Sequence, residues 1–380
     1  MPKIIITGDL FPTITNTEQF IAGDINSIFG EKIVQLFKEA DYVVCNLEGA
    51  LCSDEVRPID KDGPILRAPL ESIKGIVDAG VDCVSLANNH TTDYGMEGYT
   101  QTCSVLEENN IVFFGAGKNC NAIVTHHIEL IGKYRVGFYG VSETIFNIPG
   151  DNSPGANLYD DYRTCREIEE LKKNCDYVFV LYHGGVEHFE YPIPMIRTRF
   201  HRMADSGADV ILAQHTHCIA EEEYYHNSYL LYGQGNFCLN YLPESNQWNL
   251  YGLMLEIGIS EGGLDIHKIV VKRTAIGTSY DPEQNMKAFT ERTKRLSENG
   301  NFEQEFSAFA NERVWTYLQA FRGGNLLDRL VLVVFGKKTY RKYLLKHYNK
   351  KQLLKILNAL RAEEFRSITI QGVQNIIEKM

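Results

Sequence analysis

The sequence predicts a layered α/β domain over residues 1–280, followed by a helical region over residues 281–380. Short β-rich runs alternate with amphipathic stretches in the first part, as in domains whose helices pack on the faces of sheets. Two longer β-rich runs joined by Glu261-Gly262-Gly263 predict a closing hairpin, and the pattern after Tyr280 becomes helix-rich. A chain of 380 residues is long enough for one large domain with an appendage, or for two domains.

The local pattern assigns the elements in order. The apolar, β-branched and aromatic runs predict strands at Ile4–Thr7, Tyr42–Leu47, Cys83–Leu86, Ile111–Phe114, Tyr134–Val141, Tyr177–Tyr182, Val210–Ala213, Tyr229–Tyr232, Tyr251–Ser260 and Leu264–Arg273. The amphipathic stretches between them predict helices at Glu31–Glu39, Leu70–Ala79, Gly98–Asn109, Arg163–Lys173 and Pro194–Ser206.

The composition is that of a soluble globular protein, with 44% hydrophobic and 23% charged residues. No apolar run approaches the roughly 20 residues that a membrane span needs. The chain passes from Met1-Pro2-Lys3 directly into an apolar strand, so we expect no secretory signal. Nine scattered cysteines without a CxxC pair favour a reduced, cytoplasmic location and a role as small core residues, for example Cys45, Cys83 and Cys175.

The charge is unevenly distributed along the chain. The net charge of −11 argues against nucleic acid as a partner. Residues 281–380 contain 18 Lys and Arg against 11 Asp and Glu, a net charge of +7, which leaves −18 for the first 280 residues. The segment from Arg329 to Lys355 carries no acidic residue. This basic region predicts either docking on an anionic surface, such as the inner face of the membrane, or packing against the acidic first domain.

Polar clusters follow five of the short apolar strands, where ligand sites of α/β sheets lie. They are Gly8-Asp9, Asn46–Gly49, Asn88–His90, His183–Gly185 and His215–His217. Carboxylate, amide oxygen and imidazole are the ligands of hard and borderline divalent cations. Two such cations about 3.5–4 Å apart can clamp the oxygens of a displacement reaction. The clusters therefore predict one or two divalent ions (Mn, Zn, Fe or Mg), with the candidate ligands Asp9, Glu48, Asn89, His183, His215 and His217.

Some of these clusters belong to longer polar segments, and further segments follow along the chain. They are Arg67-Ala68-Pro69, Ser85-Leu86-Ala87-Asn88-Asn89-His90, Asp93-Tyr94-Gly95, His183-Gly184-Gly185-Val186-Glu187, Gly207-Ala208-Asp209-Val210, Gln214-His215-Thr216-His217 and Gly233-Gln234-Gly235-Asn236-Phe237. Together they resemble the CapA-type, poly-γ-glutamate capsule group within the calcineurin-like metallophosphoesterases. The resemblance covers roughly residues 1–245.

This resemblance implies a four-layer αββα sandwich, with two mixed sheets flanked by helices and a C-terminal helical appendage. It also assigns the six candidate ligands. Asp9 and His217 would hold one ion, and Asn89, His183 and His215 would hold the other. Glu48 would bridge the two ions.

The resemblance implies roles for five further residues. His90 would contact the leaving group and be oriented by Asp93. Arg67 would bind an anionic substrate, although a structural salt bridge is an equal alternative. Glu187 is a candidate substrate contact or hydrogen-bond anchor, and Asn236 a candidate ligand contact within a structural loop. The implied substrate is an anionic polymer or a small phosphorylated or carboxylated molecule.

Three positions depart from the wider superfamily pattern. The superfamily pattern opens with Asp-x-His, whereas here Asp9 is followed by Leu10 and Phe11. One metal site therefore lacks a usual imidazole, which leaves its occupancy open. Glu48 stands where the superfamily has Asp, and Gln214 stands where Gly or His often precedes the last His-x-His. The expected function is a metal-dependent hydrolase in capsule or exopolysaccharide biosynthesis. The alternative is a non-catalytic assembly or polymer-binding protein that retains the fold.

Overall fold

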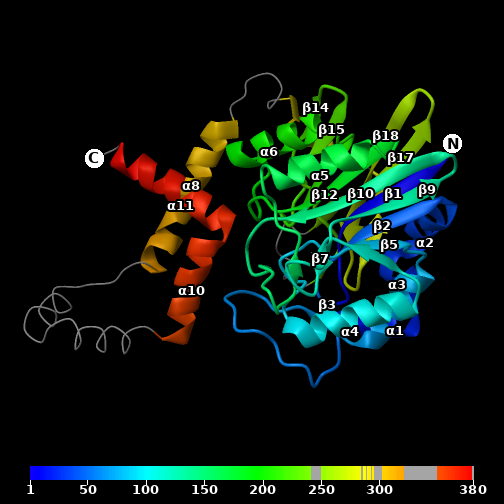
Figure 1. Cartoon of the computed structure of the whole chain (residues 1–380), viewed down its shortest axis with the longest axis horizontal. Helices are drawn as coiled ribbons and strands as arrows, with labels where there is room; N and C mark the ends of the chain where they lie inside the picture. The colour runs from blue at the N-terminus through cyan, green and yellow to red at the C-terminus, as the bar shows by residue number, and fades with distance from the viewer. Residues whose placement is uncertain are drawn as a thin grey trace, which may run out of the picture. The chain divides into compact units, whose positions relative to one another are not determined.

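The computed structural model describes residues 1–240, 250–283, 286, 287, 289–291, 293, 294, 302–320 and 349–378, with the backbone alone at 315–320 (Figure 1). These residues belong to two compact units. The first comprises Met1–Ile59 and Ile65–Glu303, and the second comprises Asp60–Pro64 and Gln304–Met380. All six candidate metal ligands lie in the first unit. The division of the chain into domains at residue 280 stays a prediction.

The first sheet has the strand order β19-β18-β17-β1-β2-β5-β6, with β16 beside β1. Its strands β1, β2, β5 and β6 run parallel, whereas β17, β18 and β19 continue the sheet antiparallel. The bounds are β1 Lys3–Leu10, β2 Tyr42–Leu47, β5 Cys83–Ser85, β6 Val112–Phe114, β16 Asn236–Cys238, β17 Tyr251–Ser260, β18 Gly263–Arg273 and β19 Thr278–Tyr280.

The second sheet has the strand order β14-β15-β13-β12-β10-β9. Its four inner strands are parallel, and the two edge strands are antiparallel to their neighbours. The bounds are β9 His126–Ile131, β10 Tyr134–Ser142, β12 Tyr177–His183, β13 Val210–Gln214, β14 Glu222–Tyr225 and β15 Ser228–Leu231. Short strands form two small sheets, with bounds β3 Ala50–Leu51, β4 Arg67–Ala68, β7 Ala116–Gly117, β8 Ile123–Val124 and β11 Gly155–Ala156.

The two large sheets pack face to face around one hydrophobic cluster. Ile4 and Ile6 of β1 point into this cluster, where they meet Phe138 of β10, Leu181 of β12 and Leu212 of β13. All five side chains are at most 1% exposed. Because successive side chains of a strand alternate between faces, the intervening residues of β1 serve the opposite face of the sheet.

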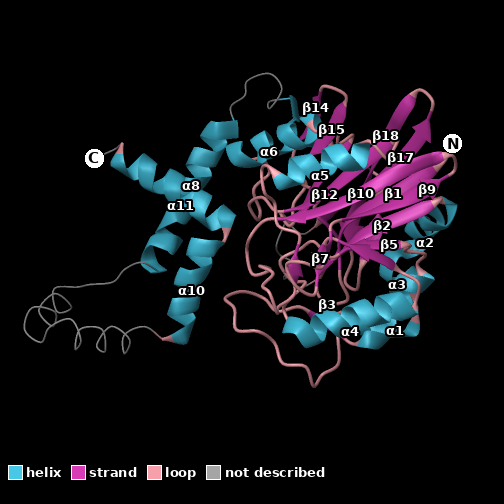
Figure 2. Cartoon of the chain, viewed as in Figure 1, coloured by secondary structure: helices cyan, strands magenta, loops and turns pink. Residues whose placement is uncertain are grey.

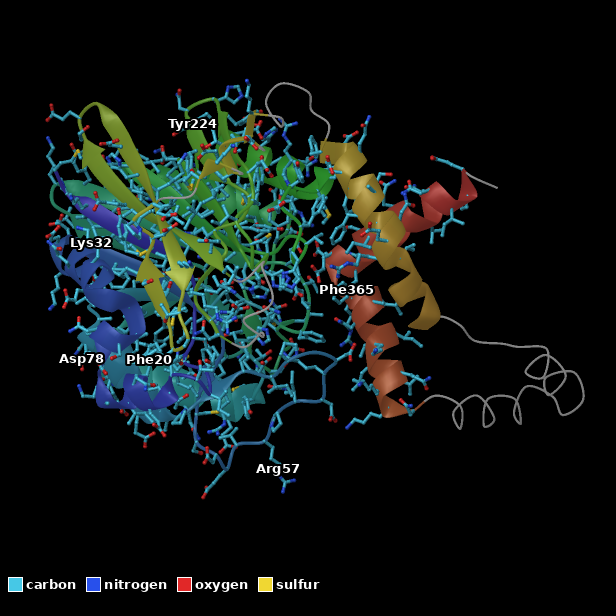
Figure 3. All side chains as sticks on the ribbon, turned by 180° about the vertical axis from the view of Figure 1, so that it is seen from behind. Phe20, Lys32, Arg57, Asp78, Tyr224 and Phe365 are labelled. Carbon is cyan, nitrogen blue, oxygen red and sulfur yellow. The ribbon has the colours of Figure 1, made fainter. Side chains whose placement is uncertain are left out.

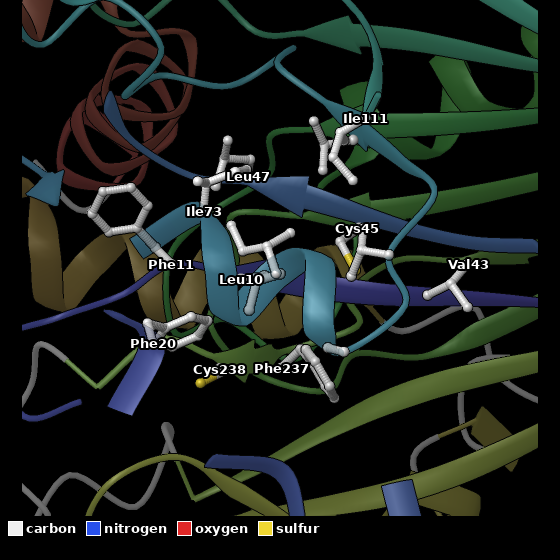
Figure 4. Close-up of a cluster of buried hydrophobic side chains, with 14 of the residues drawn as sticks. Leu10, Phe11, Phe20, Val43, Cys45, Leu47, Ile73, Ile111, Phe237 and Cys238 are labelled. Atoms are coloured by element: carbon white, nitrogen blue, oxygen red, sulfur yellow. The ribbon is translucent and has the colours of Figure 1, made fainter. Parts of the chain in front are cut away.

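Helices cover the outer face of each sheet (Figure 2). On the first sheet they are α1 Thr17–Ala22, α2 Ile25–Glu39, the 3-10 turn Leu70–Ser72, α3 Ile73–Asp78 and α4 Gly95–Glu108. Phe20 of this layer lies with Phe237 in the hydrophobic cluster of Figure 4, and Phe29 packs against both rings. Figure 3 shows Phe20 and Asp78 at the contact between α1 and α3.

The outer face of the second sheet carries α5 (Arg163–Lys172) and α6 (Pro194–Asp205). Phe200 of α6 packs edge-to-face on Tyr182 of β12, with ring centroids 5.2 Å apart. The layers therefore follow the order helix, sheet, sheet, helix. The predicted four-layer αββα sandwich is confirmed.

The second unit contains helices α10 (Lys350–Arg361) and α11 (Glu363–Ile377), and α8 (Phe302–Ala320) from Gln304 onward. Asn349 begins α10 with a capping box, in which it exchanges hydrogen bonds of 2.9 and 3.0 Å with Gln352. Asn375 of α11 donates to the carbonyl of Ser307 of α8 at 3.0 Å. Within the described part of the chain, no helix is long and apolar enough to cross a membrane.

Only part of the predicted basic region can be located. Residues 329–348, which carry most of its Lys and Arg, lie outside the described residues. Lys350, Lys351 and Lys355 are exposed on α10, beside the exposed side chains of Leu353 and Leu357. Docking through this region stays a prediction.

Some elements are longer than predicted, and others were not predicted. Strand β1 runs to Leu10 rather than ending at Thr7, so the prediction that Gly8 and Asp9 follow the strand is wrong and both lie within it. The prediction that the cysteines are small core residues is confirmed for six of the nine, among them Cys45, Cys83 and Cys175, whereas Cys103 and Cys165 are half-buried and Cys120 is exposed. The sequence patterns missed the short helix α1 and the strands β9, β14, β16 and β19.

Candidate metal centre

The carboxyl ends of strands from both sheets meet at one edge of the sandwich. Asp9 lies within β1, where the backbone register shifts before Leu10, and it pairs with Asn46 of β2 on one side. His183 is the last residue of β12 and pairs with Gln214, the last residue of β13. Parallel strands thus deliver a carboxylate from the first sheet and an imidazole from the second to the same place.

The candidate ligands form two groups that share one carboxylate. The ligand atoms of Glu48, His183 and His215 lie within 4.8 Å of one another, and so do those of Asp9, Glu48 and His217. All five residues are buried, none more than 3% exposed. Because Glu48 belongs to both groups, the arrangement is the one that two neighbouring ions bridged by a carboxylate require.

Asn89 adds an amide oxygen to the first group. Its Oδ1 lies 2.8 Å from Nε2 of His183, which in turn lies 3.6 Å from Oε1 of Glu48. Nδ1 of His217 lies 3.6 Å from Oδ2 of Asp9. Two ligand atoms that each lie about 2.1 Å from a common ion are about 3.0–3.4 Å apart. The separations in the first group are close to this spacing. In the second group Nδ1 of His217 also lies 2.8 Å from Oδ1 of Asn236, so the ring would bind an ion through Nε2.

The electrostatics of the centre favour a cation. Burial, reinforced by the charge of Asp9, raises the pKa of Glu48 well above its usual range. Neither carboxylate oxygen of Glu48 has a hydrogen-bond partner among the described residues. Burial lowers the pKa of His183 well below its usual value and that of His217 to about 4, so both imidazoles are neutral near pH 7. Neutral imidazoles beside an unsatisfied carboxylate are the donor set that a divalent ion fits.

His90 faces the shared carboxylate. Its Nδ1 lies 2.7 Å from Oδ2 of Asp93, which also accepts the backbone N–H of Leu66 at 2.7 Å. Its Nε2 lies 3.9 Å from Oε1 of Glu48. Asp93 thus holds one ring nitrogen while the other points toward the ligand cluster. The catalytic role of this pair stays a prediction.

The three candidate substrate residues have different surroundings. Arg67 pairs with Asp54 and donates to the carbonyl of Cys52 at 3.1 Å, so the salt bridge weighed as its alternative role is present. Oδ1 of Asn236 lies 2.8 Å from Nδ1 of His217 and orients that ring. Glu187 is partly exposed after β12, and its charge adds to the raised pKa of Glu48. Their binding of substrate stays a prediction.

Comparison with known proteins identifies the family. Residues 3–241 match the family described as bacterial capsule synthesis protein PGA_cap. The chain belongs to this family. The resemblance to the CapA-type group that the motifs indicated is thereby confirmed.

Two relatives carry the name CapA. The capsule biosynthesis protein CapA of Bacillus anthracis is 29% identical over 208 residues, which cover 53% of this chain and 51% of that protein. The PGA biosynthesis protein CapA of Bacillus subtilis (strain 168) is 30% identical over 217 residues, 56% of each chain. The PGA_cap chain therefore spans about half the length of these relatives. A phosphatase structure from Mycoplasma pneumoniae aligns at 14% identity with a TM-score of 0.45, covering 77% of this chain and 98% of that one.

Two buried amides of this PGA_cap chain support the ligands, a role that the sequence analysis did not assign to either residue. Nδ2 of Asn46 donates to Oδ1 of Asp9 at 2.8 Å, and Oδ1 of Asn46 accepts from Asn88 at 3.1 Å. Nε2 of Gln214 donates to the carbonyl of Thr7 at 3.1 Å and so joins the two sheets below the centre. A polar residue inside an otherwise apolar strand is the signal that could have found Asn46, because a buried amide needs partners.

The loop that carries the last two histidines has an unusual backbone. His215 and His217 have φ values of 87° and 54°, a region that residues with a Cβ rarely adopt. The backbone N–H of His215 donates to Oδ2 of Asp9 at 3.3 Å. Such conformations cost of order 1–3 kcal/mol each and cluster at functional sites. Here they bring both imidazoles toward the shared carboxylate.

Proposed function

We propose that this chain is a metal-dependent hydrolase of the phosphoesterase type that acts in capsule or exopolysaccharide biosynthesis. The observation that carries the proposal is the position of Glu48, which is buried, lacks a hydrogen-bond partner among the described residues and lies in both candidate ligand groups. Capsule and PGA biosynthesis appear in the names of the Bacillus relatives, and they supply the pathway class proposed for this chain.

The residues divide the chemistry between them. Bound divalent ions would lower the pKa of an attacking water and polarise an oxygen of the substrate. Asp9 and His217 would hold one ion, and Asn89 with His183 and His215 the other, on either side of Glu48. His90 donates a proton from Nε2 to the leaving-group oxygen, while Asp93 accepts a hydrogen bond from Nδ1 and fixes the ring.

The test measures metal content and turnover on the same preparation. We expect the full chain, purified without chelator and supplied with Mn²⁺ or Zn²⁺, to retain one or two ions by elemental analysis. It should hydrolyse a generic phosphomonoester or phosphodiester, and chelation should abolish this activity. A protein that stays metal-free at excess Mn²⁺ and Zn²⁺ contradicts the metal centre. A loaded protein without turnover on phosphoesters contradicts the proposed chemistry.

A non-catalytic assembly or polymer-binding role is the second candidate. It is favoured by a relative from Mycobacterium tuberculosis named as a probable polyglutamine synthesis accessory protein, 24% identical over 227 residues, 56% of this chain and 60% of that one. Phe11, where the superfamily pattern has a histidine, is buried in the hydrophobic cluster and adds no ligand. For this role we expect calorimetric binding of poly-γ-glutamate by a protein that does not turn over phosphoesters.

The proposed location is the cytoplasm, with peripheral attachment to the inner face of the membrane as an extension. Exposed Lys350, Lys351 and Lys355 on α10 support the attachment, because each near-surface Lys contributes about 1 kcal/mol toward anionic lipid. We expect the full chain to sediment with anionic but not with neutral vesicles, and to lose this binding when truncated near residue 325. Absence of binding at low salt contradicts the attachment and leaves packing against the acidic first domain.

A further inference from the structure

A buried carboxylate outside the ligand set is hydrogen-bonded to the residues on either side of His183. Glu143 follows β10 and is fully buried. Its backbone N–H donates to the carbonyl of His183 at 2.9 Å. Its side chain accepts from the hydroxyl of Tyr182 at 3.1 Å and from the backbone N–H of Gly185 at 3.4 Å. One residue thus contacts the positions before, at and after the candidate ligand.

Arg199 of α6 supplies the opposite charge. Its Nη1 lies 3.2 Å from Oε1 of Glu143 and 2.9 Å from the hydroxyl of Tyr182. The guanidinium lies over the ring of Tyr159, 4.4 Å from its centroid. The Arg199 side chain is 13% exposed and that of Glu143 is 0% exposed, so the pair is shielded from water. A buried pair of this kind is costly to break by removing one partner, which keeps the carboxylate in place.

The loop after β12 is shaped to accept this carboxylate. A Cβ on Gly184 would lie 2.5 Å from Cγ of Glu143 and 2.8 Å from Cε1 of Tyr182, so any larger residue would displace them. The backbone N–H of Gly184 donates to the carbonyl of Gln214 at 3.1 Å, and that of His188 to the carbonyl of Thr216 at 2.8 Å. The loop held by Glu143 is therefore tied to the loop that carries the other two imidazoles.

We propose that Glu143 is a positioning residue for the metal centre, and that its pair with Arg199 fixes His183 at the ion shared with Asn89 and His215. The inference rests on the proposed metal-dependent function, and it adds a residue that touches neither substrate nor ion. The group assembled around Asp9 and His217 has contacts of its own, through Asn46 and Asn236, in which Glu143 takes no part.

The test compares substitutions of two carboxylates that each pair with an arginine of α6. Glu143→Gln keeps the shape of the side chain and removes its charge. Glu223→Gln is the matched control, because Glu223 pairs with Arg197 of α6 at 2.7 Å and lies on β14, away from the His183 loop. Both variants lose a partly buried ion pair, so both should lose thermal stability. Only the first should disturb the metal centre.

The readout is Mn²⁺ binding to the chelator-treated full chain, followed by calorimetry and by electron paramagnetic resonance. We expect Glu143→Gln to lower the affinity for one of the two ions about 10–100-fold, as substitutions of residues that orient ligating histidines do. In the resonance spectrum, the signal of two coupled Mn²⁺ ions should be replaced by that of a single Mn²⁺. Glu223→Gln should keep the wild-type affinities. Glu143→Asp, which retains the charge, should recover part of the lost affinity.

The outcomes separate this inference from the proposed function. Wild-type protein that takes up no ion contradicts the metal centre, and the positioning role falls with it. If wild type binds ions and Glu143→Gln binds them with the same affinities and the same spectrum, the positioning role is overturned and the metal centre is not. Equal losses in Glu143→Gln and Glu223→Gln overturn it as well, because they show a general effect of destabilisation. If Glu143→Gln does not fold, Arg199→Lys carries the same comparison, since it keeps the charge while losing the planar group over Tyr159.

Discussion

Replacing Glu48 by glutamine separates its role as a ligand from its effect on the fold. The side chain is fully buried, and its carboxylate has no hydrogen-bond partner among the described residues. A buried carboxyl whose pKa is raised must take up a proton when the chain folds at neutral pH, which lowers the stability of wild type, whereas a glutamine carries no such cost. We expect chelator-treated Glu48→Gln to be more stable than chelator-treated wild type by about 1–3 kcal/mol, which corresponds to about 2–5 °C in Tm for a unit of this size.

Added Mn²⁺ should reverse the order of stability. An ion at 100 times its Kd stabilises the folded state by about 2.7 kcal/mol, and wild type should gain this whereas Glu48→Gln should gain little. Scanning calorimetry at neutral pH, with chelator and then with excess Mn²⁺, measures both effects. Glu170→Gln is the control, because the exposed Glu170 pairs with Lys173 on the surface, and we expect a change within about 0.5 kcal/mol. The reasoning is refuted if chelated Glu48→Gln melts below wild type, or if Mn²⁺ raises both melting temperatures equally.

Three further predictions follow from the same geometry. His90→Ala should keep its metal content but lose about 10²–10⁴-fold in kcat on any hydrolysed substrate, and unchanged turnover would remove the proposed proton donor. His215→Ala and His217→Ala should each lower the metal content measured by elemental analysis, and wild-type content in both would argue against the ligand assignment. Leu212→Ala, at a fully buried site between the sheets, should cost about 2–5 kcal/mol in denaturant unfolding without changing metal stoichiometry.

The fold was predictable where burial imposes a strong pattern. The predicted strands Tyr42–Leu47 and Tyr251–Ser260 agree with β2 and β17 to the residue, because both are central and largely apolar. The missed strands β9 and β14 lie at the edges of their sheet, where one side faces solvent and polar residues interrupt the pattern. Helix α1, with six residues, is too short to show a helical period.

Candidate site residues were predictable where they follow an apolar run in the sequence. Asp9, Glu48 and His183 each stand at or next to the end of an apolar run, and the structure brings all three together. The role of Glu143 is not marked in the sequence, because its partner Arg199 lies 56 residues further along the chain, and only the packing of α6 on the sheet joins them. Side chains that act through long-range pairs stay hidden in a single sequence.

The left-handed backbone at His215 and His217 limits how this protein could be engineered for robustness. Glycine is the usual replacement at such positions, because it adopts positive φ without strain. At this loop the replacement would remove the imidazoles themselves, so the stability that relief of the backbone strain would add cannot be gained by design. Asn110, with φ of 58° in the turn before β6, has the same conformation without a ligand to lose. A programme of stabilisation should therefore begin at that turn and leave the histidine loop as it is.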